Sequence, residues 1–103
     1  MQQHMKQLSR HFMAEQLWNY RTEQHLTQEQ MAEMLWISPR SYIDLEHGRY
    51  RCSMMTIFLF LLWLEDDAVL QLVDDFRSLL QEETEYEIPQ RPRDHKHHLQ
   101  HPV

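Results

Sequence analysis

Residues 27–48 read TQEQMAEMLWISPRSYIDLEHG, and this segment has the clearest helix-start and helix-end signals in the chain. Thr27 and Gln30 have the spacing of a capping box, in which the threonine hydroxyl accepts from the Gln30 amide and the glutamine side chain reaches back. Ser38 followed by Pro39 indicates a second helix start, with a serine N-cap and a proline at the first helical position. Gly48 is expected to end that helix in the left-handed conformation. The stretch therefore predicts two short helices.

Apolar residues in both predicted helices have the spacing needed for packing. Met31, Ala32 and Leu35 face inward from the first helix, and Tyr42 and Leu45 hold the second helix to the core. A tight turn at residues 36–37 joins the two. This arrangement is typical of a helix-turn-helix, whose second helix enters the major groove of DNA.

The rest of the chain predicts three more helices. One runs from about residue 5 to residue 24 and carries an apolar stripe at Met13, Leu17 and Tyr20. Another begins at the N-cap Ser53 and runs to about residue 64, with Met54, Ile57, Leu61 and Leu64 facing inward. The last begins at residues 65–67, where three acids suit a helix N-terminus. Its expected apolar face comprises Ala68, Val69, Leu72, Val73, Phe76, Leu79 and Leu80.

Composition agrees with an all-α fold, since the 103 residues include a single glycine. Residues 1–87 are expected to form one compact five-helix domain with an extended first helix. Residues 88–103 are polar and rich in histidine and proline, which predicts a disordered tail. Nothing fixes the geometry of its four histidines, so we expect neither a metal site nor a cofactor. These are His95, His97, His98 and His101.

Several classes of protein are disfavoured by the sequence. A lone Cys52 excludes an internal disulfide and a cysteine-rich zinc site, and it suits a reducing cytoplasm. The N-terminus has no apolar secretory segment. The longest apolar run, residues 54–64, is shorter than the roughly 20 residues that cross a bilayer. We see no nucleophile–base pair, phosphate loop or metal cluster, so an enzyme is not expected.

The net charge of −6 is unevenly distributed. Residues 1–51 hold six bases and six acids and are neutral, whereas residues 52–103 hold ten acids and four bases. DNA repels an acidic surface, so a DNA-binding surface has to lie in the N-terminal half.

The segment LTQEQMAEMLWISPRSYIDLEHG, from Leu26 to Gly48, resembles the Xre or lambda-repressor-like (Cro/C1-type) helix-turn-helix family. The likeness extends back through Leu17, Tyr20 and Arg21 and forward from Ser53 to about residue 64. That family usually has glycine where this chain has His25 and Trp36. Both positions are therefore expected in a left-handed or strained backbone.

The resemblance also implies roles for individual residues. Thr27 and Gln28 stand where the first helix of the motif begins, and Gln28 matches a position that binds a DNA phosphate. Arg21 and Glu46 match a buried ion pair between the first helix and the second helix of the motif. The exposed face of the recognition helix would comprise Pro39, Arg40, Ser41, Ile43 and Asp44.

For some of these side chains the sequence allows more than one role. Arg40 is the foremost base-reading candidate, because its guanidinium can bond guanine O6 and N7 together, although a phosphate contact or plain solvation is the alternative. Asp44 suits a cytosine amino group or acts by repulsion, and Ile43 suits a thymine methyl or packs on a neighbouring helix. Arg49 and Arg51 are expected to clamp phosphate rather than form a solvated turn.

The excess of apolar residues in residues 54–64 has two interpretations. Other helices cover it, or it forms a subunit interface, since a large apolar patch on a monomer is a liability. We expect a homodimer through the fourth and fifth helices that reads a near-palindromic site in double-stranded DNA as a repressor-like regulator. The alternative is a protein-interaction module, antitoxin-like or an adaptor, whose acidic, leucine-rich fifth helix binds a partner. No small-molecule ligand is expected.

Overall fold

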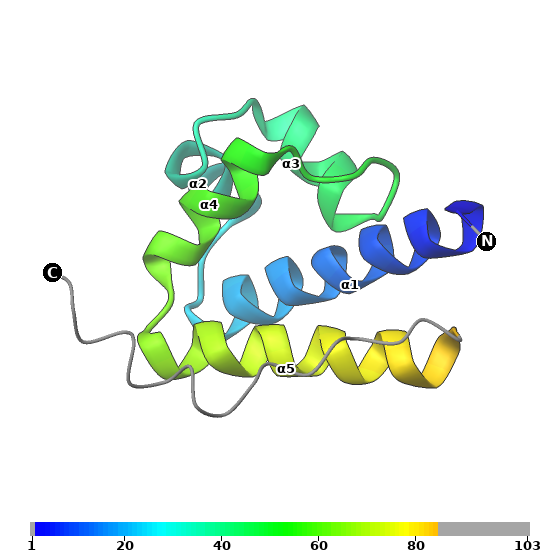
Figure 1. Cartoon of the computed structure of the whole chain (residues 1–103). Coiled ribbons are helices and arrows are strands. Elements are labelled where there is room, and N and C mark those ends of the chain that lie inside the picture. Colours follow the sequence, from blue (N-terminus) through cyan, green and yellow to red (C-terminus); the bar gives the residue numbers. More distant parts are fainter. Residues whose placement is uncertain (1, 85–103) are drawn as a thin grey trace, which may run out of the picture. The chain divides into compact units, whose positions relative to one another are not determined.

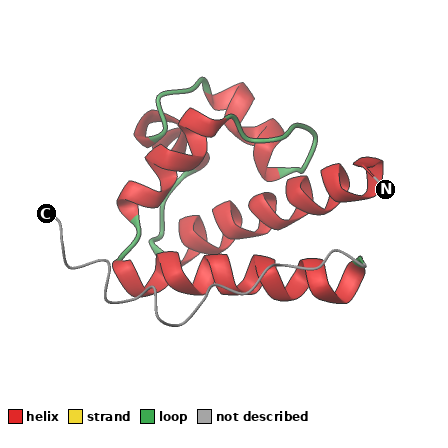
Figure 2. Ribbon diagram, viewed as in Figure 1, coloured by secondary structure: helices red, strands yellow, loops and turns green. Residues whose placement is uncertain are grey.

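The computed structural model describes residues 2–84 of the chain, and in this range helices joined by short loops are the only regular secondary structure (Figure 1, Figure 2). The prediction of an all-α fold is thereby confirmed. The predicted tail at residues 88–103 lies outside the described residues. Five helices follow one another in the described range: α1 (Gln2–Glu23), α2 (Gln28–Met34), α3 (Pro39–Glu46), α4 (Met54–Trp63) and α5 (Asp66–Glu83).

The chain divides into two compact units, residues 1–73 and residues 74–103, with the boundary inside α5. The first unit contains α1 to α4 and the first turns of α5, and α2, α3 and α4 lie on one side of α1 (Figure 1). In the second unit the C-terminal part of α5 buries Leu80 and holds an exposed ion pair of Arg77 with Asp74 at 2.7 Å.

The core of the first unit is built mainly from the helix-turn-helix. Tyr42 and Leu45 of α3 pack with side chains from three other helices, and Tyr42 is fully buried. The Tyr20 ring meets the Phe60 ring edge to face, with centroids 5.6 Å apart, and this contact ties α1 to α4. The remaining buried residues of the cluster are Leu17, Met31, Ala32, Leu35 and Phe60, of which the first four match the predicted inward positions.

Three helix starts are capped by the predicted side chains. The Thr27 hydroxyl accepts from the Gln30 amide at 3.0 Å, and the Gln30 side chain accepts from the Thr27 amide at 2.8 Å. Ser38 accepts from the Ser41 amide at 3.1 Å with Pro39 next to it, and Ser53 caps α4 in the same way. The predicted starts of α2, α3 and α4 are confirmed, because each cap satisfies an amide that the helix leaves unpaired.

The first three helices end in the same left-handed motif. His25, Trp36 and Gly48 have φ angles of 58°, 61° and 73°. The amide of each donates to the carbonyl three residues earlier, and the next amide donates to the carbonyl five residues earlier, at 2.9 Å after His25 and 3.0 Å after the other two. This is the Schellman pattern. The expected left-handed backbone at His25 and Trp36 is confirmed.

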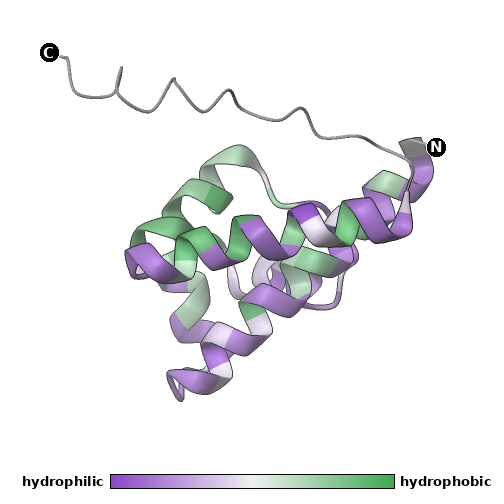
Figure 3. Cartoon of the chain, turned by 60° about the horizontal axis from the view of Figure 1, so that its bottom comes forward, coloured by the Kyte–Doolittle hydropathy of each residue, from purple (hydrophilic) through white to green (hydrophobic). Residues whose placement is uncertain are grey.

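The inward face predicted for α4 is partly wrong. Met54 was expected to face the core, but its side chain is 72% exposed, and Thr56 and Phe60 are the buried residues of the helix. Thr56 tolerates burial because its hydroxyl accepts from the Ser53 hydroxyl at 3.0 Å. Almost every position in α4 is apolar, as its green colour in Figure 3 shows, so no periodicity marks the inward face.

The apolar face predicted for α5 is narrower than expected. Leu72 packs on the core and Val69 is half-buried, but Ala68 and Val73 are exposed. The predicted apolar face of α5 was thus too wide by about one residue at each edge. In the structure these edge residues are in contact with solvent.

Candidate nucleic-acid interface

Glu46, the last residue of α3, is the centre of a polar cluster beneath the helix-turn-helix. Arg21 donates through Nε to Glu46 Oε2 at 2.7 Å and through Nη2 to Oε1 at 3.2 Å. The Tyr42 hydroxyl donates to Oε2 at 2.6 Å, and the Gln28 amide donates to Oε1 at 2.9 Å. Arg21 also donates to the Leu26 carbonyl at 3.1 Å. The expected pair of Arg21 and Glu46 therefore forms, and it links α1, α2 and α3.

The cluster fixes the protonation of its members. Burial would raise the pKa of the Glu46 carboxyl, but the hydrogen bonds donated to it outweigh burial and lower its pKa. The hydrogen bond to Glu46 raises the pKa of Arg21. Burial, and then the bond to Glu46, raises the pKa of the Tyr42 hydroxyl, which stays protonated and donating. At neutral pH the cluster therefore contains a charged Arg21 and a charged Glu46, and it connects α1, α2 and α3.

Gln28 has a role that the sequence did not indicate. The resemblance implied a phosphate contact for Gln28, and the structure adds that its side-chain amide donates to Glu46, with the residue half-buried at the first position of α2. Thr27 beside it is exposed and occupied as the N-cap. Sequence reasoning also missed the Tyr42 hydroxyl. The spacing of four residues from Tyr42 to Glu46 on one helix was the pattern that could have revealed it.

The outer face of α3 presents the expected recognition residues unevenly. Pro39, Arg40 and Ser41 are exposed, and 83% of the Arg40 side chain is accessible. Ile43 and Asp44 are half-buried. The first turn of α3 is therefore its most accessible part, which is also where recognition helices contact base edges.

Asp44 is held by two arginines. Arg49 Nη1 lies 2.7 Å from Asp44 Oδ1, and Arg40 Nε lies 3.8 Å from Oδ2. Only 14% of the Asp44 side chain is exposed. An aspartate engaged in this way positions the arginines on either side of it, which favours a supporting role over direct contact with a cytosine.

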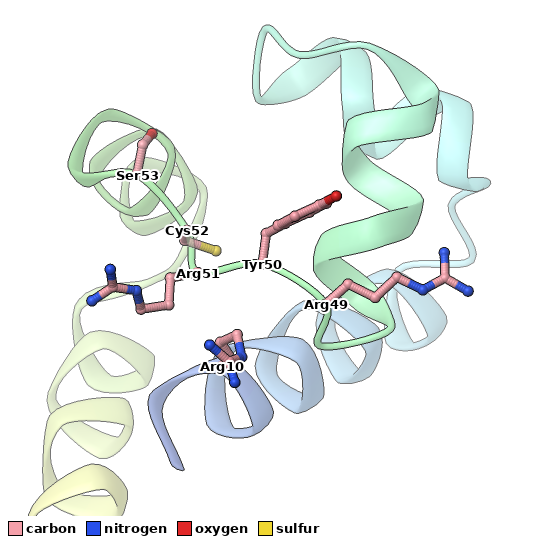
Figure 4. Close-up of a pocket in the computed structure, with 6 residues that line it drawn as sticks. All are labelled: Arg10, Arg49, Tyr50, Arg51, Cys52 and Ser53. Atoms are coloured by element: carbon pink, nitrogen blue, oxygen red, sulfur yellow. The ribbon is translucent and has the colours of Figure 1, made fainter. Parts of the chain in front are cut away.

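The loop from α3 to α4 carries the basic residues expected to clamp phosphate. Arg49, Tyr50 and Arg51 are exposed. They border an open hollow of about 540 Å³, called here the arginine hollow, which also includes a residue of α1 (Figure 4). Its lining residues are Arg10, Arg49, Tyr50, Arg51, Cys52 and Ser53.

Arg10 was not among the predicted site residues. It lies 11 residues before Arg21, which is close to three helical turns, so both side chains leave α1 on nearly the same face. This spacing was the available pattern, but Arg10 lies well before the segment that carries the helix-turn-helix pattern.

Two other kinds of site were sought in the described part of the chain. No three His, Cys, Asp or Glu side chains of residues 2–84 come together as metal ligands do. None of the five helices combines the length and apolar character needed to cross a bilayer. The four histidines of the sequence's C-terminal end lie outside the described residues.

Comparison with known proteins gives one match. Residues 19–61 match the family model described as Helix-turn-helix, and this segment contains α2, α3, the arginine-bearing loop and most of α4. No curated protein and no solved structure matches the chain. The capped helices, the left-handed turn at Trp36 and the ion pair of Arg21 with Glu46 provide independent structural support. Residues 19–61 are thus similar to the Cro/C1-type helix-turn-helix family of DNA-binding regulatory domains.

Proposed function

We propose that the protein is a sequence-specific regulator that acts as a repressor-like homodimer and uses α3 to read the major groove of double-stranded DNA. The observation that carries the proposal is the position of Arg40. Its guanidinium is the most accessible cation on the outer face of α3, one residue into the helix and beside the exposed Ser41. An arginine placed there can bond guanine O6 and N7 at once.

The remaining expected contacts surround Arg40. Thr27 and Gln28 mark the start of α2, where backbone amides and side chains can approach a phosphate. Arg49 and Arg51 flank the other end of α3. Ile43 is half-buried and so offers only part of its side chain to a thymine methyl. The protein acts by binding in this proposal, and none of these residues has a catalytic role.

The second subunit is argued from an apolar face on α4 and α5. Large side chains in these helices lie open to solvent although the core beside them is well packed, and they recur along one side of α4 at spacings of three and four residues. We call this set the apolar face: Met54, Met55, Phe58, Leu62 and Trp63 of α4, with Leu70 and Val73 of α5.

Charge favours a second copy of this chain as the occupant. The net charge of −6 comes from residues 52–103, so two copies can meet there most readily through a surface without charged groups. No charged residue occurs between Met54 and Leu64, and two such helices can meet without bringing like charges together. Two recognition helices in a two-fold dimer would read half-sites about 34 Å apart on one side of the duplex.

DNA binding is tested by selecting bound duplexes from a random pool and measuring the affinity of the selected site. The proposal predicts a near-palindromic site. It also predicts that Arg40→Ala lowers affinity for the selected site more than for a scrambled duplex, by about 1–3 kcal/mol. Arg77→Ala, an arginine of α5, is the control and should bind like the wild type. Absence of binding at low salt, or equal losses on both duplexes, would contradict the proposal.

The oligomeric state is tested by sedimentation equilibrium. Leu62→Glu places a charge in the apolar face and should convert dimers to monomers, whereas Trp36→Glu changes an exposed aromatic residue outside it and should not. A wild-type chain that stays monomeric at high concentration and binds DNA would refute the dimer. It would favour the other interpretation, in which α4 and α5 bind a different protein.

A further inference from the structure

The arginine hollow holds more cationic charge than its own ion pairs neutralise. Three of its six lining residues are arginines and none is acidic. The Arg49 guanidinium is paired with Asp44, outside the lining residues. Arg10 and Arg51 make no ion pair within residues 2–84, in a chain whose net charge is −6. The hollow therefore has two cations available for an anion.

The hollow combines parts of the chain that are far apart in sequence. Arg10 comes from the N-terminal half of α1, and residues 49–53 form the loop between α3 and α4. Figure 4 shows α1 beneath this loop, with Arg10 below Arg51, while Arg49 extends from the loop in the opposite direction. Two guanidinium groups from separate elements are thus presented together.

Backbone packing holds α1 against the loop. A Cβ atom on Gly48 would lie 4.0 Å from the Arg10 carbonyl oxygen and 3.9 Å from the Ala14 Cβ. The end of α3 therefore rests directly on the turn of α1 that carries Arg10. Arg10 therefore lines the hollow from a helix that is packed against the end of α3.

Positive charge continues from the recognition helix to the hollow. Asp44 is 3.8 Å from Arg40 on one side and 2.7 Å from Arg49 on the other. Arg49 in turn borders the hollow. A strand whose bases face Arg40 would carry its phosphates along this line of arginines, and the hollow is open, as contact with a polymer requires.

We propose that Arg10 of α1 binds a backbone phosphate of the DNA together with Arg51, so that α1 forms part of the DNA-binding surface. This inference rests on the proposed function and extends it to an element outside the helix-turn-helix. Arg10 contributes sequence-independent affinity, because a phosphate contact positions the duplex without reading its bases.

The test is the salt dependence of DNA affinity for Arg10→Ala. Each neutralised phosphate contributes about 0.9 to the slope of log affinity against log salt, so the variant should lose about that much. Raising salt from about 50 to about 200 mM should then weaken the wild type about 3.5-fold more than the variant. The loss should be equal on selected and scrambled duplexes. Arg77→Ala is the matched control, and Arg10→Lys, which keeps the charge, should retain the wild-type slope.

The outcomes separate this inference from the proposed function. If the wild type does not bind DNA, the proposed function fails. If the wild type binds and Arg10→Ala keeps its slope, only the role of Arg10 is refuted, and an equal loss in Arg10→Lys refutes it also. Inorganic phosphate is compared with chloride at matched ionic strength. Competition by phosphate that disappears in Arg10→Ala would support the assignment, because free phosphate can displace DNA through Arg10 only if Arg10 contacts the DNA. Phosphate that binds the wild type through Arg10 without weakening its DNA affinity would overturn it.

Discussion

Arg21 Nε lies 2.7 Å from Glu46 Oε2, and this ion pair connects α1 to the end of α3. The two side chains are only 18% and 4% exposed. Arg21→Ala leaves a buried carboxylate without its cation, so we expect a loss of about 3–5 kcal/mol in the free energy of unfolding by urea. Arg77→Ala breaks an exposed pair and should cost no more than about 1 kcal/mol. Equal losses in the two variants would show that the buried pair contributes no more to stability than the exposed pair.

Acid should weaken the domain through Glu46. Its folded-state pKa is lowered, so the carboxylate contributes stability above the unfolded pKa of about 4.3, and this contribution is lost as pH falls through the lower folded value. Glu46→Gln removes the titrating group. The difference in unfolding free energy between wild type and variant should therefore shrink as the pH falls from about 5 towards 2. A difference independent of pH would contradict this assignment.

The Cys52 thiol should react slowly in the folded protein. Burial raises its pKa to about 11, so very little thiolate exists near neutral pH. We expect a disulfide reagent at pH 8 to modify the folded chain far more slowly than the urea-unfolded chain. The raised pKa also means that stability is full below the unfolded thiol pKa and falls as pH rises through about 11. Similar rates in the folded and unfolded chains would show that the thiol is not shielded.

The two N-caps of the helix-turn-helix should each contribute measurably to stability. Thr27→Ala and Ser38→Ala each remove an oxygen that accepts from a helix amide, at 3.0 and 3.1 Å. Each should cost about 1 kcal/mol in thermal or urea unfolding. Ser78→Ala, on the exposed surface of α5, is the control and should leave stability nearly unchanged. A cap variant indistinguishable from that control would refute the capping role.

Replacing Trp36 by glycine should stabilise the domain. Trp36 has a φ of 61° and its side chain is 84% exposed, so it carries the strain of a left-handed conformation with little packing in return. The relief, reduced by the greater freedom of glycine in the unfolded chain, is expected to be about 0.5–1 kcal/mol. Trp18→Gly, inside α1, should destabilise instead. A lower melting temperature for Trp36→Gly would show that the indole makes stabilising contacts.

The helix-turn-helix was predictable because local chemistry specifies it. Thr27, Ser38 and Gly48 act on amides and carbonyls a few residues away, so their effect can be inferred without the tertiary fold. The inward side of α4 was not predictable, since Met54 and Phe60 are both apolar and only tertiary packing distinguishes them.

The candidate site was predictable only in part, for a related reason. The exposure of Arg40 follows from its place in the first turn of α3. The bond from Gln28 to Glu46, and the approach of Arg10 to the loop, depend on where three helices meet. Such contacts have no periodicity within one element, and only the helix spacing from Arg10 to Arg21 indicated one of them.

Three helices end in the same left-handed motif, yet only one of them has glycine there. His25 and Trp36 are not among the residues proposed to contact DNA, so glycine at these positions should raise stability without altering the proposed contacts. The free energy of unfolding of the domain can thus be raised at two positions. A variant with glycine at both turns would be the better starting scaffold for diversifying α3, because its added stability would offset part of the cost of destabilising substitutions.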